Sequence, residues 1–407
     1  MTEQGVQIVK GVGIAVLFVV ILGLLAIAVV PRFLDRIYYR GPPSDHFDGA
    51  RFFNPDGDED TASPPTGGSR GGFFWNYLTG RDGRPAWPKT VAVEPSKPAA
   101  RVAGEAMVVT WIGHATLLIQ TQGLNILTDP VYAERAGPFG FGPQRVTRPG
   151  VAFDDLPPID VVLVSHNHYD HMDLSALQRI WQRDRPRIVT SLGNDAILRG
   201  RGIAATGLDW GGRVELKPGV AVVVTRNHHW GSRWFADRNR ALWSSFVVEL
   251  PGGNVFFAGD TGLGDGTWAD AAAALGPIRF AAIPIGAFRF RPGQMGIGSH
   301  MGPVDAVEAF RRLKAWRAMP IHWGTFRLSF EAYDTPPKLL EAAKACGGTQ
   351  TWPMIGTAFD VAQIGRLVAI PPIANPVVPP PVVVPPGAPD RAALLRCLDT
   401  PAVRALP

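Results

Sequence analysis

The sequence predicts an α/β protein, and three observations support this fold class. Short apolar runs recur at 159–164, 220–225 and 254–258, the first two of them rich in β-branched residues, and such runs are typical of buried strands. A segment with helical spacing, 174–182, follows the first run, and Asp173 is suited to cap its N-terminus. Polar side chains follow each run at once, where loops carry function on a rigid scaffold.

The loop after the first of these strands holds the most informative motif. It contains His166, His168, Asp170 and His171 in one short stretch. Neutral imidazole and carboxylate are the usual ligands of zinc and related cations. His166 and His168 project to the same side of an extended backbone and can hold one ion, whereas the other two can reach a second. A histidine-rich surface loop is the alternative, but this crowding after a buried strand favours a metal site.

Three further loops offer candidate ligands at matching places. Each follows a short apolar run, and the candidates are His228 or His229, Asp260 and His322. Taken singly, Asp260 is more often a turn residue, and a lone histidine is more often a hydrogen-bonded core residue. Because all the candidates lie just past the end of a strand, the sequence predicts one site that contains them together.

The order of these motifs resembles the metallo-β-lactamase superfamily, and more closely the N-acyl-phosphatidylethanolamine-hydrolysing phospholipase D family. The segments that carry the resemblance are Trp111 to Thr116, Thr128 to Pro130, Leu156 to Asp160, Ser165 to His171, Phe256 to Gly262 and Ile321 to Phe326. The resemblance extends over residues 70–355. It implies an αβ/βα four-layer sandwich with a metal site at one edge.

The resemblance also implies a ligand set for two Zn²⁺ ions. The first ion would be held by His166, His168 and His229, and the second by Asp170, His171 and His322, with Asp260 bridging them. The catalytic candidates are Asp170 and His300, of which His300 matches a family histidine near the substrate. His228 stands where a non-histidine is expected, so the assignment of His229 can shift by one residue.

Two further positions are interpreted as supports for the ligands. His114 lies in a turn between apolar runs and is read as a structural histidine rather than a catalytic one. Asp129 suits a similar role, because metal ligands need hydrogen bonds that fix their tautomer and orientation. Four arginines are candidates for phosphate contact: Arg145, Arg148, Arg289 and Arg291. The alternative for each is a solvated surface arginine.

The N-terminal segment predicts a membrane anchor. Gly11 to Val30 is an unbroken apolar stretch, and a helix needs about 20 residues to cross a bilayer. Lys10 precedes the stretch and several arginines follow it, which by the positive-inside rule places the catalytic part on the cytoplasmic side. A cleaved secretory signal is the alternative, but the apolar run is long for a signal and little positive charge precedes it.

Composition divides the rest of the chain into one domain with appendages. The expected parts are an anchor at 1–40, a linker at 41–70, a metallo-hydrolase domain at 71–360 and a proline-rich C-terminal tail at 361–407. Cys346 and Cys397 are too few for a disulfide framework and leave the redox compartment open.

These features together predict a function. The formal net charge of +5 suits anionic lipid head groups, and also nucleic acid. We expect a membrane-anchored, zinc-dependent phosphodiesterase of phospholipase D type that hydrolyses N-acyl-phosphatidylethanolamine-like lipids by metal-bound hydroxide. Its expected partners are the phospholipid substrate and the membrane, without nucleic acid. The alternatives are a lactonase or nuclease on the same fold, or a catalytically silent membrane scaffold.

Overall fold

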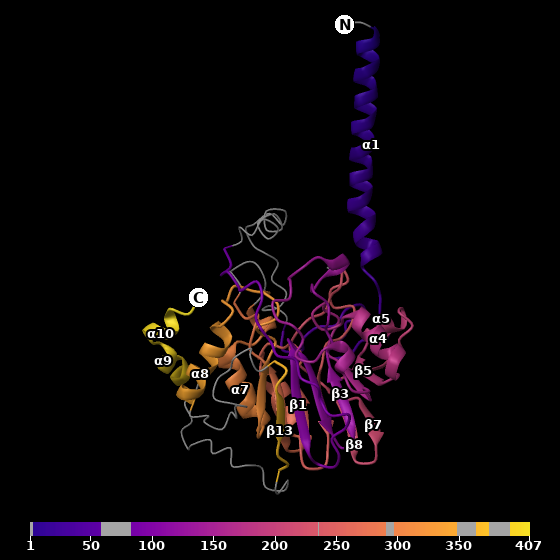
Figure 1. Ribbon diagram of the computed structural model, residues 1–407. Coiled ribbons are helices and arrows are strands. Elements are labelled where there is room, and N and C mark those ends of the chain that lie inside the picture. Colours follow the sequence, from indigo (N-terminus) through magenta and orange to yellow (C-terminus); the bar gives the residue numbers. More distant parts are fainter. Residues whose placement is uncertain (1–2, 58–82, 235, 290–296, 348–363, 374–390) are drawn as a thin grey trace.

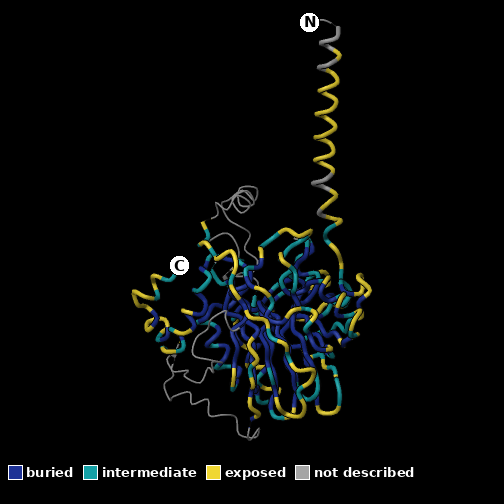
Figure 2. Tube along the Cα trace, viewed as in Figure 1, coloured by how far each residue is buried: buried dark blue, intermediate teal, exposed yellow. Residues whose placement is uncertain are grey.

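The computed structural model describes residues 3–57, 83–234, 236–289, 297–347, 364–373 and 391–407. A long helix, α1 (Glu3–Leu34), stands away from an α/β domain that contains the other elements (Figure 1). The domain is built on two sheets, and the buried residues concentrate along their strands (Figure 2).

The first sheet has seven strands in the order β13-β1-β2-β3-β4-β5-β6. Their bounds are β1 (Met107–Gly113), β2 (Thr116–Thr121), β3 (Leu124–Thr128), β4 (Val161–Val164), β5 (Arg187–Ser191), β6 (Thr206–Leu208) and β13 (Leu367–Ile370). The strands from β3 to β6 run parallel to one another, whereas β13, β1, β2 and β3 pair in antiparallel fashion.

The second sheet has six strands in the order β12-β11-β10-β9-β8-β7. Their bounds are β7 (Arg213–Lys217), β8 (Val220–Thr225), β9 (Ser245–Glu249), β10 (Asn254–Phe257), β11 (Ile278–Pro284) and β12 (Ala318–Ile321). Here β10, β11 and β12 are parallel, and β7 to β10 form antiparallel pairs.

Alternating side chains bind the sheets and helices into layers. In β2, Leu117 and Ile119 join the main core that both sheets share, whereas Leu118 faces a second core under the helices. The first sheet is covered by α4 (Leu174–Asp184) and α5 (Asn194–Arg199), and the second by α6 (Thr267–Ala273), α7 (Pro303–Leu313) and α8 (Thr335–Gly347). The order helix, sheet, sheet, helix confirms the predicted αβ/βα sandwich.

The strand and cap predicted around the first motif are confirmed. Strand β4 is buried throughout, and α4 begins directly after Asp173. The Asp173 side chain accepts hydrogen bonds from the backbone N–H groups of Ser175 and Ala176, which satisfies two donors at the helix N-terminus. The histidine motif therefore lies on a loop whose two ends are both held rigidly.

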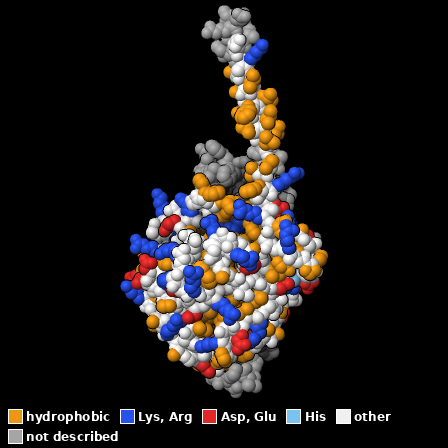
Figure 3. Space-filling view, turned by 90° about the vertical axis from the view of Figure 1, so that its right-hand side faces the viewer, with side chains coloured by type: hydrophobic (Ala, Val, Ile, Leu, Met, Phe, Trp, Pro, Cys, Tyr) orange, Lys and Arg blue, Asp and Glu red, His pale blue; other side chains and the backbone are white. Residues whose placement is uncertain are grey.

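The described residues of the N-terminal helix are mostly exposed (Figure 2), and many of their side chains are apolar (Figure 3). Among them are Val12, Leu17 and Phe18, each more than half exposed. In the described part of the chain, no helix combines the length and the apolar character that crossing a membrane requires. The transmembrane anchor expected at 1–40 is therefore not supported.

The expected linker at 41–70 differs from the structure over its first part. Phe47 and Phe52 are buried, and they pack with Leu242 and Trp243 in a small core of their own. Residues 41–57 thus belong to the folded domain, because their aromatic side chains have an apolar partner surface. The remainder of that segment, 58–70, lies outside the described residues.

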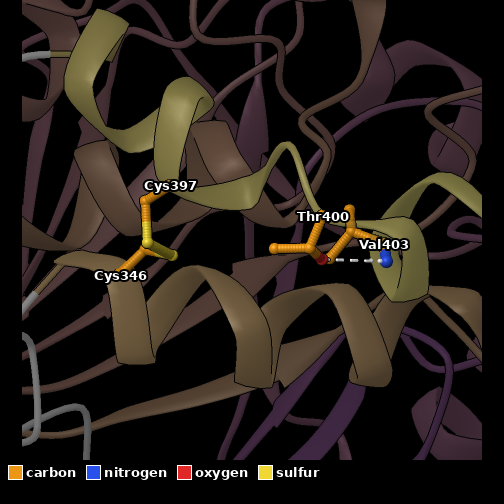
Figure 4. Close-up of a disulfide and its surroundings, with 4 residues drawn as sticks. All are labelled: Cys346, Cys397, Thr400 and Val403. Carbon is orange, nitrogen blue, oxygen red and sulfur yellow. Dashed lines mark hydrogen bonds between the residues drawn. A yellow bond between two sulfur atoms is a disulfide. The ribbon is translucent and has the colours of Figure 1, made fainter.

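The expected boundary at residue 360 also differs. Strand β13 pairs with β1, and Cys346 forms a disulfide with Cys397 that joins α8 to α9 (Arg391–Leu398) (Figure 4). A last short helix, α10 (Pro401–Arg404), is capped by Thr400. The described C-terminal residues therefore extend the domain, while most of the proline-rich stretch, 374–390, lies outside the described residues.

Candidate metal centre

The predicted ligands converge at one edge of the sandwich. His166, His229, Asp260 and His322 each lie shortly after the C-terminal end of a strand, namely β4, β8, β10 and β12. These four side chains are 1% exposed or less, so the convergence takes place in the interior of the protein. The structure thus brings together residues that are far apart in the sequence.

The first cluster contains three imidazoles. Nδ1 of His168 lies 2.8 Å from Nε2 of His166 and 3.4 Å from Nε2 of His229. Oδ2 of Asp260 lies 4.0 Å from Nε2 of His166 and 3.9 Å from Nε2 of His229. Four ligand-type atoms therefore surround one point, as the first metal site requires.

The second cluster meets the first at the same carboxylate. Nε2 of His171 and Nε2 of His322 each lie 3.0 Å from Oδ2 of Asp260. Oδ2 of Asp170 lies 3.7 Å from Nε2 of His171 and 3.6 Å from Nε2 of His322. His114 joins this group, because its Nε2 is 3.1 Å from the same oxygen of Asp170.

The polar atoms of these clusters fit a bound cation. Among the described residues, neither carboxylate oxygen of Asp260 receives a hydrogen bond, and Nε2 of His171 and Nε2 of His322 also make none. Buried polar atoms are ordinarily hydrogen-bonded because an unsatisfied one is costly. A cation at each cluster would satisfy them, so these His and Asp residues can bind metal.

Asp129 supports both clusters from behind. Its Oδ2 accepts hydrogen bonds from Nδ1 of His171 at 2.7 Å and from Oγ of Ser165 at 2.6 Å. Oγ of Ser165 in turn lies 2.9 Å from Nδ1 of His166. Each imidazole thereby has its Nδ1 occupied and its Nε2 directed to the cluster. This is the supporting role predicted for Asp129.

Electrostatics prepare the site for cations. Burial by itself would raise the pKa of Asp260, but His171 and His322 hold that pKa well below its ordinary value. Burial lowers the pKa of His168 to about 3, so this imidazole is neutral near pH 7. Two other rings differ: although burial opposes it, Asp260 and Asp170 raise the pKa of His171 above its ordinary value and that of His322 to about 9. Because metal coordinates an ionised carboxylate and neutral imidazole, a bound cation would displace a proton from these two rings.

The two adjacent histidines lie in different surroundings. His229 directs its Nε2 into the first cluster, whereas Nδ1 of His228 lies 2.9 Å from Oδ2 of Asp56, outside both clusters. The assignment of the ligand to His229 rather than His228 is therefore the one that the geometry supports.

His300 lies beside the ligand clusters. Its Nδ1 is 3.7 Å from Oδ2 of Asp260, and it forms a group with Asp260 and His322. The Nε2 of His114 lies 3.1 Å from Oδ2 of Asp170, which agrees with the supporting role predicted for His114. Both histidines therefore border the second cluster.

The arginines predicted to contact phosphate lie in different surroundings. Arg145 is buried and donates to the backbone carbonyls of Val131 and Ala133. Arg289 donates to the carbonyl of Leu406 at 2.9 Å. Arg148 is exposed, and Arg291 lies outside the described residues.

Comparison with known proteins agrees with this architecture. The family described as "Beta-lactamase superfamily domain" matches residues 124–323, which include all seven predicted ligands. The chain is 36% identical over 244 residues to N-acyl-phosphatidylethanolamine-hydrolyzing phospholipase D 1 of Caenorhabditis elegans, covering 57% of this chain and 68% of that protein. The chain belongs to the metallo-β-lactamase superfamily.

Two further comparisons are informative. The mitochondrial N-acyl-phosphatidylethanolamine-hydrolyzing phospholipase D of Saccharomyces cerevisiae is 30% identical over 245 residues, which cover 59% of this chain and 52% of the yeast protein. A possible metal-dependent hydrolase from Veillonella parvula has the same fold, with a TM-score of 0.50 and 16% identity over 65% of this chain and 99% of that chain. This protein is a metal-dependent hydrolase of the metallo-β-lactamase superfamily.

Proposed function

We propose that this metallo-β-lactamase superfamily hydrolase is a phosphodiesterase of phospholipase D type. Its substrate is N-acyl-phosphatidylethanolamine or a similar lipid, and its products are phosphatidic acid and the free head-group alcohol. The observation that carries the proposal is the pair of ligand clusters that meet at Oδ2 of Asp260. The 36% identity to a phospholipase D that acts on this lipid class supports the choice of substrate.

The resident metals are proposed to be two zinc ions. One would be held by His166, His168 and His229, the other by Asp170, His171 and His322, and Asp260 would bridge them. Imidazole and carboxylate ligands without thiolate suit catalytic zinc. When bound, such a metal pair lowers the pKa of a water molecule and neutralises charge that develops on a phosphodiester oxygen.

Side chains around the clusters position the groups that react. Hydrolysis forms a bond from the water oxygen to phosphorus, breaks the bond to the head-group oxygen and delivers a proton to that oxygen. Asp170 lies 3.1 Å from Nε2 of His114, which holds its carboxylate in place. Burial lowers the pKa of His300 to about 4, so His300 is neutral near pH 7 and suited to orient a phosphate oxygen or the leaving alcohol.

We propose that the enzyme works at a lipid surface. The exposed apolar side chains of α1 support this location, as do Phe139 and Phe141, which are 84% and 68% exposed. The Phe139 ring contacts Trp234, and Arg36 lies over the same Trp234 ring. Exposed aromatic side chains beside a cation are suited to the interface between water and phospholipid.

The disulfide is relevant to which compartment the catalytic domain faces. Disulfides persist in oxidising compartments and are rare where thiols are kept reduced. The Cys346–Cys397 bond therefore favours an oxidising compartment over the cytoplasmic side that the flanking charges suggest. We propose that the catalytic domain faces such a compartment.

Lipid hydrolysis with metal analysis tests the proposal. Purified protein should bind about two zinc equivalents and release phosphatidic acid from vesicles that contain N-acyl-phosphatidylethanolamine. Asp260→Asn should remove the metals and the activity, while Asp154→Asn, the same change at an exposed position, should preserve both. Folded, metal-loaded protein that leaves phospholipids intact but cleaves a lactone or nucleic acid would overturn the proposed substrate class.

A further inference from the structure

The segment that follows α1 packs on the loop that carries His229. We name residues 35–57 the N-terminal strap. Its start is tied down by ion pairs from Asp35 to Arg240 and by a hydrogen bond from the Tyr38 hydroxyl to Asp237 at 2.8 Å. Its middle is held by the backbone N–H of Phe52, which donates to the carbonyl of Asn239 at 2.8 Å. The strap therefore lies against residues 237–240, shortly after the ligand.

The side chain of Asn54, in the strap, forms two hydrogen bonds with the backbone of His229. The Nδ2 of Asn54 donates to the carbonyl of His229 at 2.9 Å, and its Oδ1 accepts from the N–H of His229 at 3.2 Å. Nε1 of Trp243 donates to the same Oδ1 at 3.1 Å. Asn54 is 2% exposed, so these bonds form without competition from water.

The chemistry of the side chain explains why asparagine stands here. A carboxamide carries a donor and an acceptor on one rigid plane, and it can satisfy both the N–H and the C=O of one residue. An aspartate at this position would set a carboxylate against the carbonyl of His229. An alanine would leave both backbone groups of His229 without this partner.

Asp56 holds the side chain of His228, the residue before His229, away from the clusters. Its Oδ2 lies 2.9 Å from Nδ1 of His228, and its Oδ1 accepts from Arg226 at 2.6 Å. His228 is thus held outside the clusters while His229 points into the first one. On the other side, Nδ1 of His229 donates to the carbonyl of Ser299 at 2.8 Å, which fixes the ring.

From this geometry we infer that the strap is part of the metal centre and that Asn54 is a positioning residue for His229. This inference rests on the proposed two-metal site. Asn54 is not among the clustered ligand side chains, and it binds the backbone of His229 instead. It sets the backbone from which the third imidazole of the first cluster reaches Nδ1 of His168 at 3.4 Å. Outer-shell partners of this kind commonly change metal affinity by about 10- to 100-fold.

Zinc titration against a chromogenic chelator tests the inference with full-length protein. The wild type should bind zinc in two steps. Asn54→Ala should weaken one step by about 10- to 100-fold and leave the other unchanged. The weakened step should be the one that His229→Ala abolishes. Asn54→Asp, which preserves the shape of the side chain, should weaken the same step, and this variant covers the case in which Asn54→Ala does not fold.

A matched control separates positioning from general stability. Asn125 is also a fully buried asparagine, and its Nδ2 donates to the carbonyls of Ala100 and Pro158, remote from the metal ligands. Asn125→Ala should lower the melting temperature without a selective change in either zinc step.

Three outcomes decide the matter. A selective loss in both Asn54 variants supports the inference. Unchanged zinc steps in these variants, or equal weakening of both steps, would overturn it and make the strap a purely structural element. Wild-type protein that binds no zinc would instead overturn the proposed metal site, which is a distinguishable result.

Discussion

Oδ2 of Asp129 lies 2.7 Å from Nδ1 of His171, and both side chains are fully buried. The same carboxylate binds the backbone N–H and the hydroxyl of Ser165, the residue before His166. One buried carboxylate thus orients an imidazole in each ligand cluster. Since Asp129 follows β3 and the histidines follow β4, parallel pairing of neighbouring strands creates this link.

Replacement of Asp129 should weaken metal binding without removing a ligand. Asp129→Asn takes away the charge that orients His171, so we expect zinc affinity to fall by about 10- to 100-fold. Competition with a chelator measures the change. Asp154→Asn, the same substitution at an exposed position, should leave affinity as in the wild type. Equal affinities in both variants would contradict the role of Asp129.

The adjacent histidines should respond differently to the same change. His229→Ala should reduce zinc content and activity together, because its Nε2 belongs to the first cluster. His228→Ala should leave zinc content nearly intact, because its Nδ1 contacts Asp56 instead. Elemental analysis of both purified variants measures this difference. The opposite pattern would move the ligand to His228.

His300 should affect turnover more than metal content. If it orients a phosphate oxygen or the leaving alcohol, His300→Ala should lower turnover by roughly 10²- to 10⁴-fold. Zinc content and melting temperature should change little. Loss of zinc in this variant would show instead that His300 is a ligand. Its Nδ1 lies 3.7 Å from Oδ2 of Asp260, so the ring is near enough to the clusters for that role.

The strap should contribute a pH-dependent term to stability through His46. Its ring lies 2.6 Å from Asp45 and 2.7 Å from Asp209. Burial alone lowers the pKa of His46, but the two carboxylates outweigh it and raise that pKa above its ordinary value. The stabilisation is therefore complete below the pKa of the unfolded chain and is lost as pH rises through the folded-state pKa.

The destabilisation by His46→Gln should accordingly be larger at pH 5.5 than at pH 9. Urea unfolding of wild type and variant at both values gives the difference in free energy of unfolding, and subtraction removes the contribution of groups that the two proteins share. An equal difference at the two pH values would show that His46 acts only through packing and neutral hydrogen bonds.

Reduction of the disulfide should destabilise the domain and spare the metal site. The Cys346–Cys397 bond closes a sequence separation of 51 residues, and all the proposed ligands precede it. We expect Cys397→Ser to lower the free energy of unfolding by about 2–4 kcal/mol, with zinc content unchanged. Thermal unfolding with and without reductant measures the effect. A wild type that is insensitive to reductant would contradict the prediction.

Much of the candidate site was predictable from the sequence because its signals are local. A buried strand such as β4 is recognisable from its β-branched residues, and the crowding of His166, His168 and His171 behind it indicates a cation. The N-cap at Asp173 is likewise a property of a few neighbouring residues. These features depend on backbone geometry and side-chain chemistry within one short segment.

Other features depend on contacts between distant segments, and only the tertiary structure decided them. Asn54 and Asp56 orient His229 and His228 across more than 170 positions of chain, from a segment whose composition suggested a linker. Strand β13 and the disulfide likewise close the domain beyond its expected boundary.

The physical reason is that a local pattern determines what a segment can form, but not which surface it meets. The sequence by itself determined the α/β class, the strand ends and the chemistry of the ligands. The proposal of His229 rather than His228 as the ligand rests on contacts with the strap: a hydrogen bond to each backbone group of His229 and one between His228 and Asp56. No periodicity or composition encodes such contacts. These contacts form only when the folded chain places the strap against the loop after β8.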